Sequence, residues 1–196
     1  MLNRLFNFPA TENERKFSIN NPLGRQELAA SVRAVLTEAT SSGRPIVILC
    51  IGTDRSTGDA LGPLTGSRLR SLHTYPHVFG TLDDPVHATN LADALHKITA
   101  AFVNPYIVAV DACLGRLESV GFVSVGRGPL RPGAAVNKDL PPVGDTCITG
   151  IVNVGGFMEH LVLQSTRLNL VVKMADAIAW GLASGLEEIE RGVSIC

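Results

Sequence analysis

The chain has few charged and few aromatic side chains, and its net charge is close to zero. Charged residues make up 18% of its 196 residues, aromatic residues make up 5%, and the formal net charge is −1. A chain without excess positive charge lacks the electrostatic footprint that proteins use to bind nucleic acid or anionic membranes. We therefore expect neither nucleic acid nor a membrane among its partners.

Cysteine is scarce and widely spaced. The four cysteines, Cys50, Cys113, Cys147 and Cys196, have neither the paired spacing of a zinc site nor the density of a disulfide framework. The N-terminal residues lack the layout of a signal peptide, and no apolar run reaches the length of a transmembrane helix. These absences predict a cytoplasmic protein whose thiols are reduced and mostly buried.

Apolar residues are plentiful and are arranged with the spacings of regular structure. They make up 45% of the chain, whose length fits one domain with a sizeable core. We expect residues 1–22 to be an irregular extension on the surface and residues 23–196 to form a single α/β domain. The periodicity predicts helices over residues 25–41, 61–72, 91–102, 157–164 and 170–186, and strands over 46–51, 77–82, 106–111, 120–125 and 148–154.

The order of these elements predicts the fold class. Strands that alternate with helices indicate a three-layer α/β/α sandwich with a largely parallel sheet. The segment 126–144 is rich in Gly and Pro and has no regular pattern. Loops of this length in a compact domain are usually functional.

Two predicted strands lead into carboxylates. The strand 46–51 runs into a loop that contains Asp59, and the strand 106–111 ends at Asp111. In open α/β sheets, ligands bind at the carboxyl ends of the strands. Two carboxylates that meet there raise the pKa of one of them, so that one holds a proton while the other activates water. The alternatives are that Asp59 caps a helix and that Asp111 accepts hydrogen bonds from loop amides.

Other polar residues are predicted to support this site. They are Asp54 and Thr57 in the first loop, and Lys138 and Asp145 in or near the long loop. The first loop also resembles an anion cradle, although it lacks the Gly-Lys-Ser/Thr of a P-loop.

A divalent metal is the one cofactor that the sequence suggests. Asp59, Asp111 and His87 would make a chemically sensible set of ligands for such an ion. The alternative for His87 is a solvated loop side chain, and the sequence names no certain cofactor.

Three motifs resemble, in the same order, the germination protease of spore-forming bacteria. They are Asp59-Ala-Leu-Gly-Pro63, Val110-Asp-Ala112 and Arg131-Pro-Gly-Ala-Ala-Val-Asn-Lys138. With the segment 143–156, the chain is more similar still to the short sporulation proteins of the YyaC type. The wider relatives are the hydrogenase maturation proteases, and the resemblance, over about residues 45–185, implies their phosphorylase/hydrolase-like α/β fold.

The resemblance also implies a function. Asp59 and Asp111 match the two aspartates of the germination protease, so they would activate water on a peptide bond as an atypical aspartic peptidase. The substrate would be a protein or peptide such as a small acid-soluble spore protein, in the cytoplasm of the mother cell or forespore.

Two alternatives remain open. The chain would be a non-catalytic sporulation protein that keeps the fold as a binding or assembly partner, or a metal-dependent protease of the maturation type. Its near-neutral charge makes a homo-oligomer tolerable.

Overall fold

A single six-stranded sheet forms the centre of the protein, in a computed structural model that describes residues 14–132 and 140–193. The strand order is β1-β5-β6-β4-β2-β3, and β6, β4, β2 and β3 are parallel to one another. β5 is antiparallel to β6, and β1 is antiparallel to β5. The strands are β1 (Arg15–Ser18), β2 (Ile46–Cys50), β3 (Val78–Phe79), β4 (Tyr106–Gly115), β5 (Phe122–Arg127) and β6 (Thr146–Val154).

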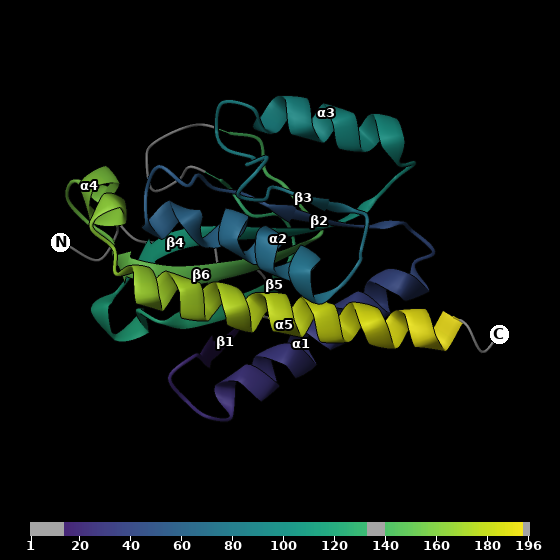
Figure 1. The fold of residues 1–196 in the computed structure, drawn as a ribbon, viewed down its shortest axis with the longest axis horizontal. Helices are drawn as coiled ribbons and strands as arrows, with labels where there is room; N and C mark the ends of the chain where they lie inside the picture. The colour runs from purple at the N-terminus through teal and green to yellow at the C-terminus, as the bar shows by residue number, and fades with distance from the viewer. Residues whose placement is uncertain (1–13, 133–139, 194–196) are drawn as a thin grey trace.

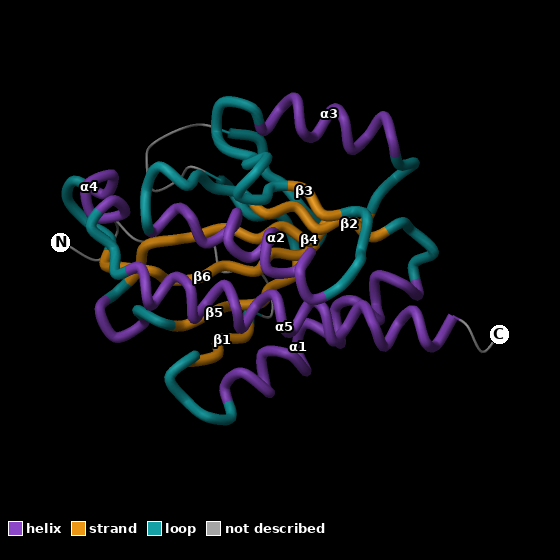
Figure 2. Tube along the Cα trace, in the orientation of Figure 1, coloured by secondary structure: helices purple, strands orange, loops and turns teal. Residues whose placement is uncertain are grey.

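Helices cover both faces of the sheet, which confirms the predicted α/β sandwich (Figures 1 and 2). The larger core lies between the sheet and α1 (Gly24–Ser41), α2 (Leu61–Leu72) and α5 (Leu168–Val193). The smaller core lies under α3 (Leu91–Ala101) on the opposite face. The short α4 (Glu159–Gln164) follows the carboxyl end of β6. None of the helices among the described residues combines the length and hydrophobicity that a bilayer crossing requires.

β2 shows why a continuous apolar run is found at the centre of such a sheet. All five of its residues are buried. Ile48 and Cys50 face the larger core, whereas Val47 and Leu49 face the smaller one. A strand with helices on both sides has no polar face, so its sequence does not alternate.

The prediction for residues 1–22 is wrong in its described part. Residues 15–18 form β1, which pairs with β5, and the side chain of Phe17 is only 5% exposed in the larger core. The strand was missed because Phe17 is its only apolar and buried residue, and the other three side chains are exposed or half-buried. One apolar residue does not produce the alternation that predicts a strand. Residues 1–13 lie outside the described residues.

Two further elements differ from the prediction: β4 at the carboxyl ends of the parallel strands, where the site was expected, and the segment 126–144 at their amino ends, because it leads from β5 to the start of β6. β4 does not end at Asp111 but continues to Gly115, because the neighbouring β6 also continues and supplies backbone partners. The segment 126–144 is pinned by an antiparallel bridge between Leu130 and Val143, both of which are buried. Its residues 133–139 lie outside the described part.

Candidate active site

The loop after β2 is held tightly against the end of the strand by close backbone approaches. Gly52 has a φ of 145°, and a Cβ atom there would lie 2.0 Å from the carbonyl oxygen of Asp59. The N–H of Thr53 donates to that same oxygen at 3.1 Å. Gly62 allows α2 to lie directly on β2, because its Cβ would be 2.0 Å from the carbonyl oxygen of Ile51. The glycines thus fix where Asp59 lies relative to the sheet.

Asp59 lies in a short 3-10 helix, η1 (Gly58–Ala60), that runs straight into α2. Its side chain is half-buried, and η1 lies against β4. The N-cap position of α2 is occupied by Ala60, so Asp59 is not the cap that the alternative interpretation required. The start of a helix favours a negative charge, so this position suits an ionised carboxylate.

Asp111 is a buried carboxyl in the middle of β4. Only 8% of the residue is exposed, and its Oδ1 accepts a hydrogen bond from the N–H of Ala112 at 2.8 Å. On one side it is in register with Thr149 of β6, and on the other side β2 has ended at Cys50. The end of β2 therefore leaves Asp111 at the boundary between the sheet and the loop of Asp59.

The two carboxyls interact electrostatically. Burial raises the pKa of Asp111 well above its ordinary value of 3.8, and the charge of Asp59 raises that pKa further. The hydrogen bond from Ala112 acts in the opposite direction and is the smallest of the three effects. The two carboxyls therefore differ in their environment. Asp111 favours its protonated form, whereas Asp59 lies at the start of a helix, where a negative charge is favoured.

A row of small polar side chains lies beside Asp111. The hydroxyls of Ser124 and Thr149 are 2.6 Å apart, and Ser124 is buried. Cys113 is hydrogen-bonded to Thr149, and burial, together with the charge of Asp111, raises the pKa of its thiol to about 12. Cys113 is therefore a neutral thiol rather than a nucleophilic thiolate.

The sequence analysis did not predict Ser124 and Cys113 as part of the site. The signal that could have found them is the presence of polar residues inside buried strands. Asp111 and Cys113, for example, are two positions apart in β4 and therefore lie on the same face of the sheet.

Asp145 lies at the amino ends of the parallel strands, opposite to the end where Asp59 and Asp111 lie, so the structure does not bring it to the predicted site. Its carboxylate accepts hydrogen bonds from Arg44 at 2.7 and 3.1 Å and from the N–H of Ile107 at 2.9 Å. Ile107 is near the start of β4, about 13 Å along the strand from Asp111. Because Asp145 precedes β6, it meets the amino ends of the parallel strands, where it has a structural role.

The remaining support residues of the prediction have mixed outcomes. Thr57 directly precedes η1 and is half-buried, whereas Asp54 is exposed in the same loop. Lys138 lies outside the described residues. Ser56, which was not among the predicted support residues, has a buried Oγ without a hydrogen-bond partner in the described part of the chain.

The predicted metal site with His87 is not formed. His87 follows the bridge between Ile51 and Val86, its Nδ1 is 2.9 Å from Thr89 Oγ1, and its N–H donates to Asn90. Across residues 14–132 and 140–193, no three His, Cys, Asp or Glu side chains are grouped so that they could hold a metal ion. Two carboxyls alone do not make the set of ligands that a divalent ion needs.

The fold is similar to that of a known protease. The crystal structure of a [NiFe] hydrogenase maturation protease, HycI from Thermococcus kodakarensis KOD1, matches with a TM-score of 0.54 and 24% sequence identity. The match covers 78% of this chain and 99% of that one. The predicted likeness to the fold of the maturation proteases is confirmed.

The sequence itself is similar to that of a protein from Bacillus subtilis. The chain is 56% identical over 161 residues to the uncharacterized protein YyaC of Bacillus subtilis (strain 168), a match that covers 79% of this chain and 78% of YyaC. The predicted resemblance to proteins of the YyaC type is thereby confirmed. The family described as "Protein of unknown function (DUF1256)" matches residues 19–181, and the chain belongs to this family.

Proposed function

We propose that the protein is a peptidase in which Asp59 and Asp111 hydrolyse a peptide bond with one activated water molecule. The observation that carries the proposal is the position of the buried Asp111 carboxyl next to the loop of Asp59, whose charge adds to the effect of burial in raising the pKa of Asp111. Pairs of carboxyls whose environments push their proton affinities apart are typical of acid/base sites. The protease-like fold is consistent with this chemistry, and the activity itself is our proposal.

The two aspartates take different roles in the proposed reaction. Asp59, at the helix start, accepts a proton from water as the hydroxide oxygen bonds to the carbonyl carbon of the substrate. Asp111 donates its proton to the amide nitrogen as the carbon–nitrogen bond breaks. One carboxyl gains the proton that the other loses, so activity requires an ionised Asp59 and a protonated Asp111.

No step in this scheme passes through a metal ion. The described part of the chain does not add a His, Cys, Asp or Glu side chain as a third ligand beside the two aspartates, and His87 is engaged with Thr89. We therefore place the metal-dependent, maturation-type mechanism below the aspartate mechanism.

We further propose that the substrate is a spore protein and that the enzyme acts in the cytoplasm of the mother cell or forespore. This part rests on the motif resemblance to the germination protease and on the similarity to YyaC. Small acid-soluble spore proteins are the substrates to test first.

The experiment compares cleavage of purified small acid-soluble spore proteins by the wild type and by Asp59→Asn. The amide cannot accept the proton from water, so we expect the rate to fall by about 100-fold or more. Asp93→Asn is the matched control, because Asp93 is an exposed aspartate on α3, away from the site, and its substitution should change the rate less than about 2-fold.

Circular dichroism establishes that each variant is folded. Equal rates for Asp59→Asn and the wild type would contradict the mechanism. Absence of cleavage by folded wild-type protein, including on a library of unrelated peptides, would favour the non-catalytic alternative. Cleavage that depends on added divalent metal would favour the maturation-type alternative.

A further inference from the structure

The outer faces of α2 and α5 carry the same arrangement, a charged residue between two apolar ones. The six residues are Leu64, Arg68 and Leu72 on α2, and Val172, Asp176 and Trp180 on α5. Steps of four residues keep the three members of each set on one side of their helix. We refer to these six residues as the α2/α5 face.

This face is open to solvent although it is largely apolar. Leu72 is 41% exposed, Val172 is 37% exposed and Trp180 is 42% exposed. Tryptophan is a residue that proteins seldom leave at the surface without a use, and it is enriched at the centres of protein interfaces.

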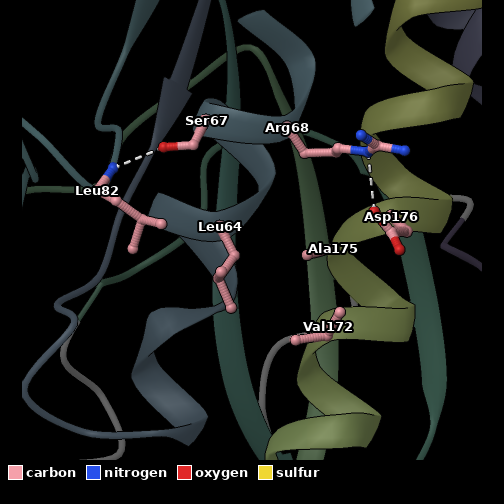
Figure 3. Close-up of a pocket in the computed structure, with 7 residues that line it drawn as sticks. All are labelled: Leu64, Ser67, Arg68, Leu82, Val172, Ala175 and Asp176. Carbon is pink, nitrogen blue, oxygen red and sulfur yellow. Dashed lines mark hydrogen bonds and ion pairs between the residues drawn. The ribbon is translucent and has the colours of Figure 1, made fainter. Parts of the chain in front are cut away.

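A groove lies beside the two charges. It has a volume of about 250 Å³ and lies between Leu64 on α2 and Val172 and Ala175 on α5, with Leu82 at its side (Figure 3). Arg68 and Asp176 reach toward each other from the two helices, with Arg68 Nε 3.0 Å from Asp176 Oδ1. About half of the Arg68 side chain and 43% of the Asp176 side chain remain exposed, so both can take a second partner.

We propose that the α2/α5 face is the contact surface of a two-fold symmetric homodimer. In such a contact the same patch of both copies meets itself. A patch that holds one cation beside one anion is complementary in charge to its own rotated copy. A two-fold axis that lies in the contact plane, passes between Arg68 and Asp176 and runs parallel to the two helices sets each Arg68 against the partner subunit's Asp176.

The spacing of the apolar residues supports the same axis. Val172 and Trp180 lie four residues, or about 6 Å, on either side of Asp176. Rotation about this axis exchanges α2 and α5 and keeps their direction, so the partner subunit's Trp180 lies over Leu72 and the partner subunit's Val172 lies over Leu64. Leu64 and Leu72 have the same four-residue spacing on either side of Arg68, so apolar contacts form on both sides of the charge contacts. The net charge of −1 opposes the approach of two copies only weakly. This proposal does not depend on the proposed peptidase activity.

Sedimentation velocity over a range of concentrations tests the dimer with charge-reversal variants. We expect the wild type to dimerise, and Arg68→Glu and Asp176→Lys each to weaken self-association by about 10-fold or more, because each creates two like-charge contacts across the axis. An equimolar mixture of the two variants should regain the dimer, since opposite charges then face each other in both contacts. Arg33→Glu, at the exposed Arg33–Glu188 pair, is the matched control and should leave the dimer unchanged.

Trp180 gives an independent measurement because it is the only tryptophan. Its emission should shift to shorter wavelength as wild-type dimers form, and Trp180→Ala should be monomeric at concentrations where the wild type is a dimer. The proposal is overturned if the wild type is monomeric throughout, if the reversed variants still dimerise, or if their mixture does not.

Discussion

The amino and carboxyl ends of the parallel strands, called here the amino edge and the carboxyl edge of the sheet, each hold a partly or fully buried aspartate. The surroundings of these two aspartates are opposite in charge. At the amino edge, Asp145 meets the guanidinium of Arg44 and a backbone N–H. At the carboxyl edge, Asp111 meets a second carboxyl, Asp59, and its pKa is raised. A carboxylate with a cation stabilises the fold, whereas a carboxyl that faces another carboxyl opposes it and is the better candidate for chemistry. The partner, rather than the residue type, distinguishes the two edges.

The largest expected contrast between the edges is in catalysis. Asp111→Asn should lower the cleavage rate by about 100-fold or more, because the amide cannot supply the proton for the leaving nitrogen. Asp145→Asn should leave the rate of the folded protein within about 2-fold. Single-turnover cleavage assays below the unfolding temperature of both variants make the comparison. A large loss of cleavage rate in folded Asp145→Asn would contradict the assignment of catalysis to the carboxyl edge alone.

The reverse contrast is expected in stability. Arg44 donates to Asp145 and also to the carbonyl oxygens of Asn104 and Pro105, at 2.9 and 2.6 Å. Its removal in Arg44→Ala leaves a half-buried carboxylate without its cation, with the N–H of Ile107 as a remaining donor, and takes the arginine donors from two carbonyls, so we expect a loss of about 2–4 kcal/mol in the free energy of unfolding.

Urea denaturation measures this loss. Arg33→Ala removes an arginine from an exposed ion pair and should cost at most about 1 kcal/mol. Similar losses for the two variants would indicate that the amino edge is not a special site of stabilisation.

At the carboxyl edge, burial of Asp111 should make the free energy of unfolding depend on pH. The folded protein holds the proton on Asp111 to higher pH than the unfolded chain does, so the wild type loses stability as pH rises through the raised pKa. Asp111→Asn cannot ionise. We expect it to be more stable than the wild type near neutral pH, with the difference vanishing below about pH 4, where Asp111 keeps its proton in both the folded and the unfolded wild type. Thermal unfolding across this pH range measures it, and a pH-independent difference would contradict the assignment.

The smallest expected effect concerns the polar row beside Asp111. Thr149→Val removes the partner of the Ser124 hydroxyl, which is buried, so the free energy of unfolding should fall by about 0.5–1 kcal/mol. Thr99→Val on the exposed side of α3 is the control and should stay within about 0.5 kcal/mol. In the double variant Ser124→Ala/Thr149→Val the losses should be less than additive, because no unpaired hydroxyl remains.

Local pattern was sufficient for the elements that contact the core on a regular face. The helix over 25–41 is α1 (Gly24–Ser41) within one residue, and the helix over 61–72 matches α2. Predictions failed where pairing with a neighbouring strand, distant in the sequence, decides whether a segment forms a strand. β1 exists because β5 offers it an edge, and β4 extends past Asp111 because β6 does.

The sequence by itself determined the fold class and the identity of the two central aspartates. A continuous apolar strand, a glycine-bearing loop and an alternation of strands with helices are local properties that lead to one architecture. Tertiary structure alone decided that Asp111 lies beside Asp59 and Thr149, that Asp145 lies with Arg44 at the far edge, and that His87 has other partners. These outcomes depend on the register and direction of strands distant in the chain, because a carboxyl takes its proton affinity from the groups that surround it in space.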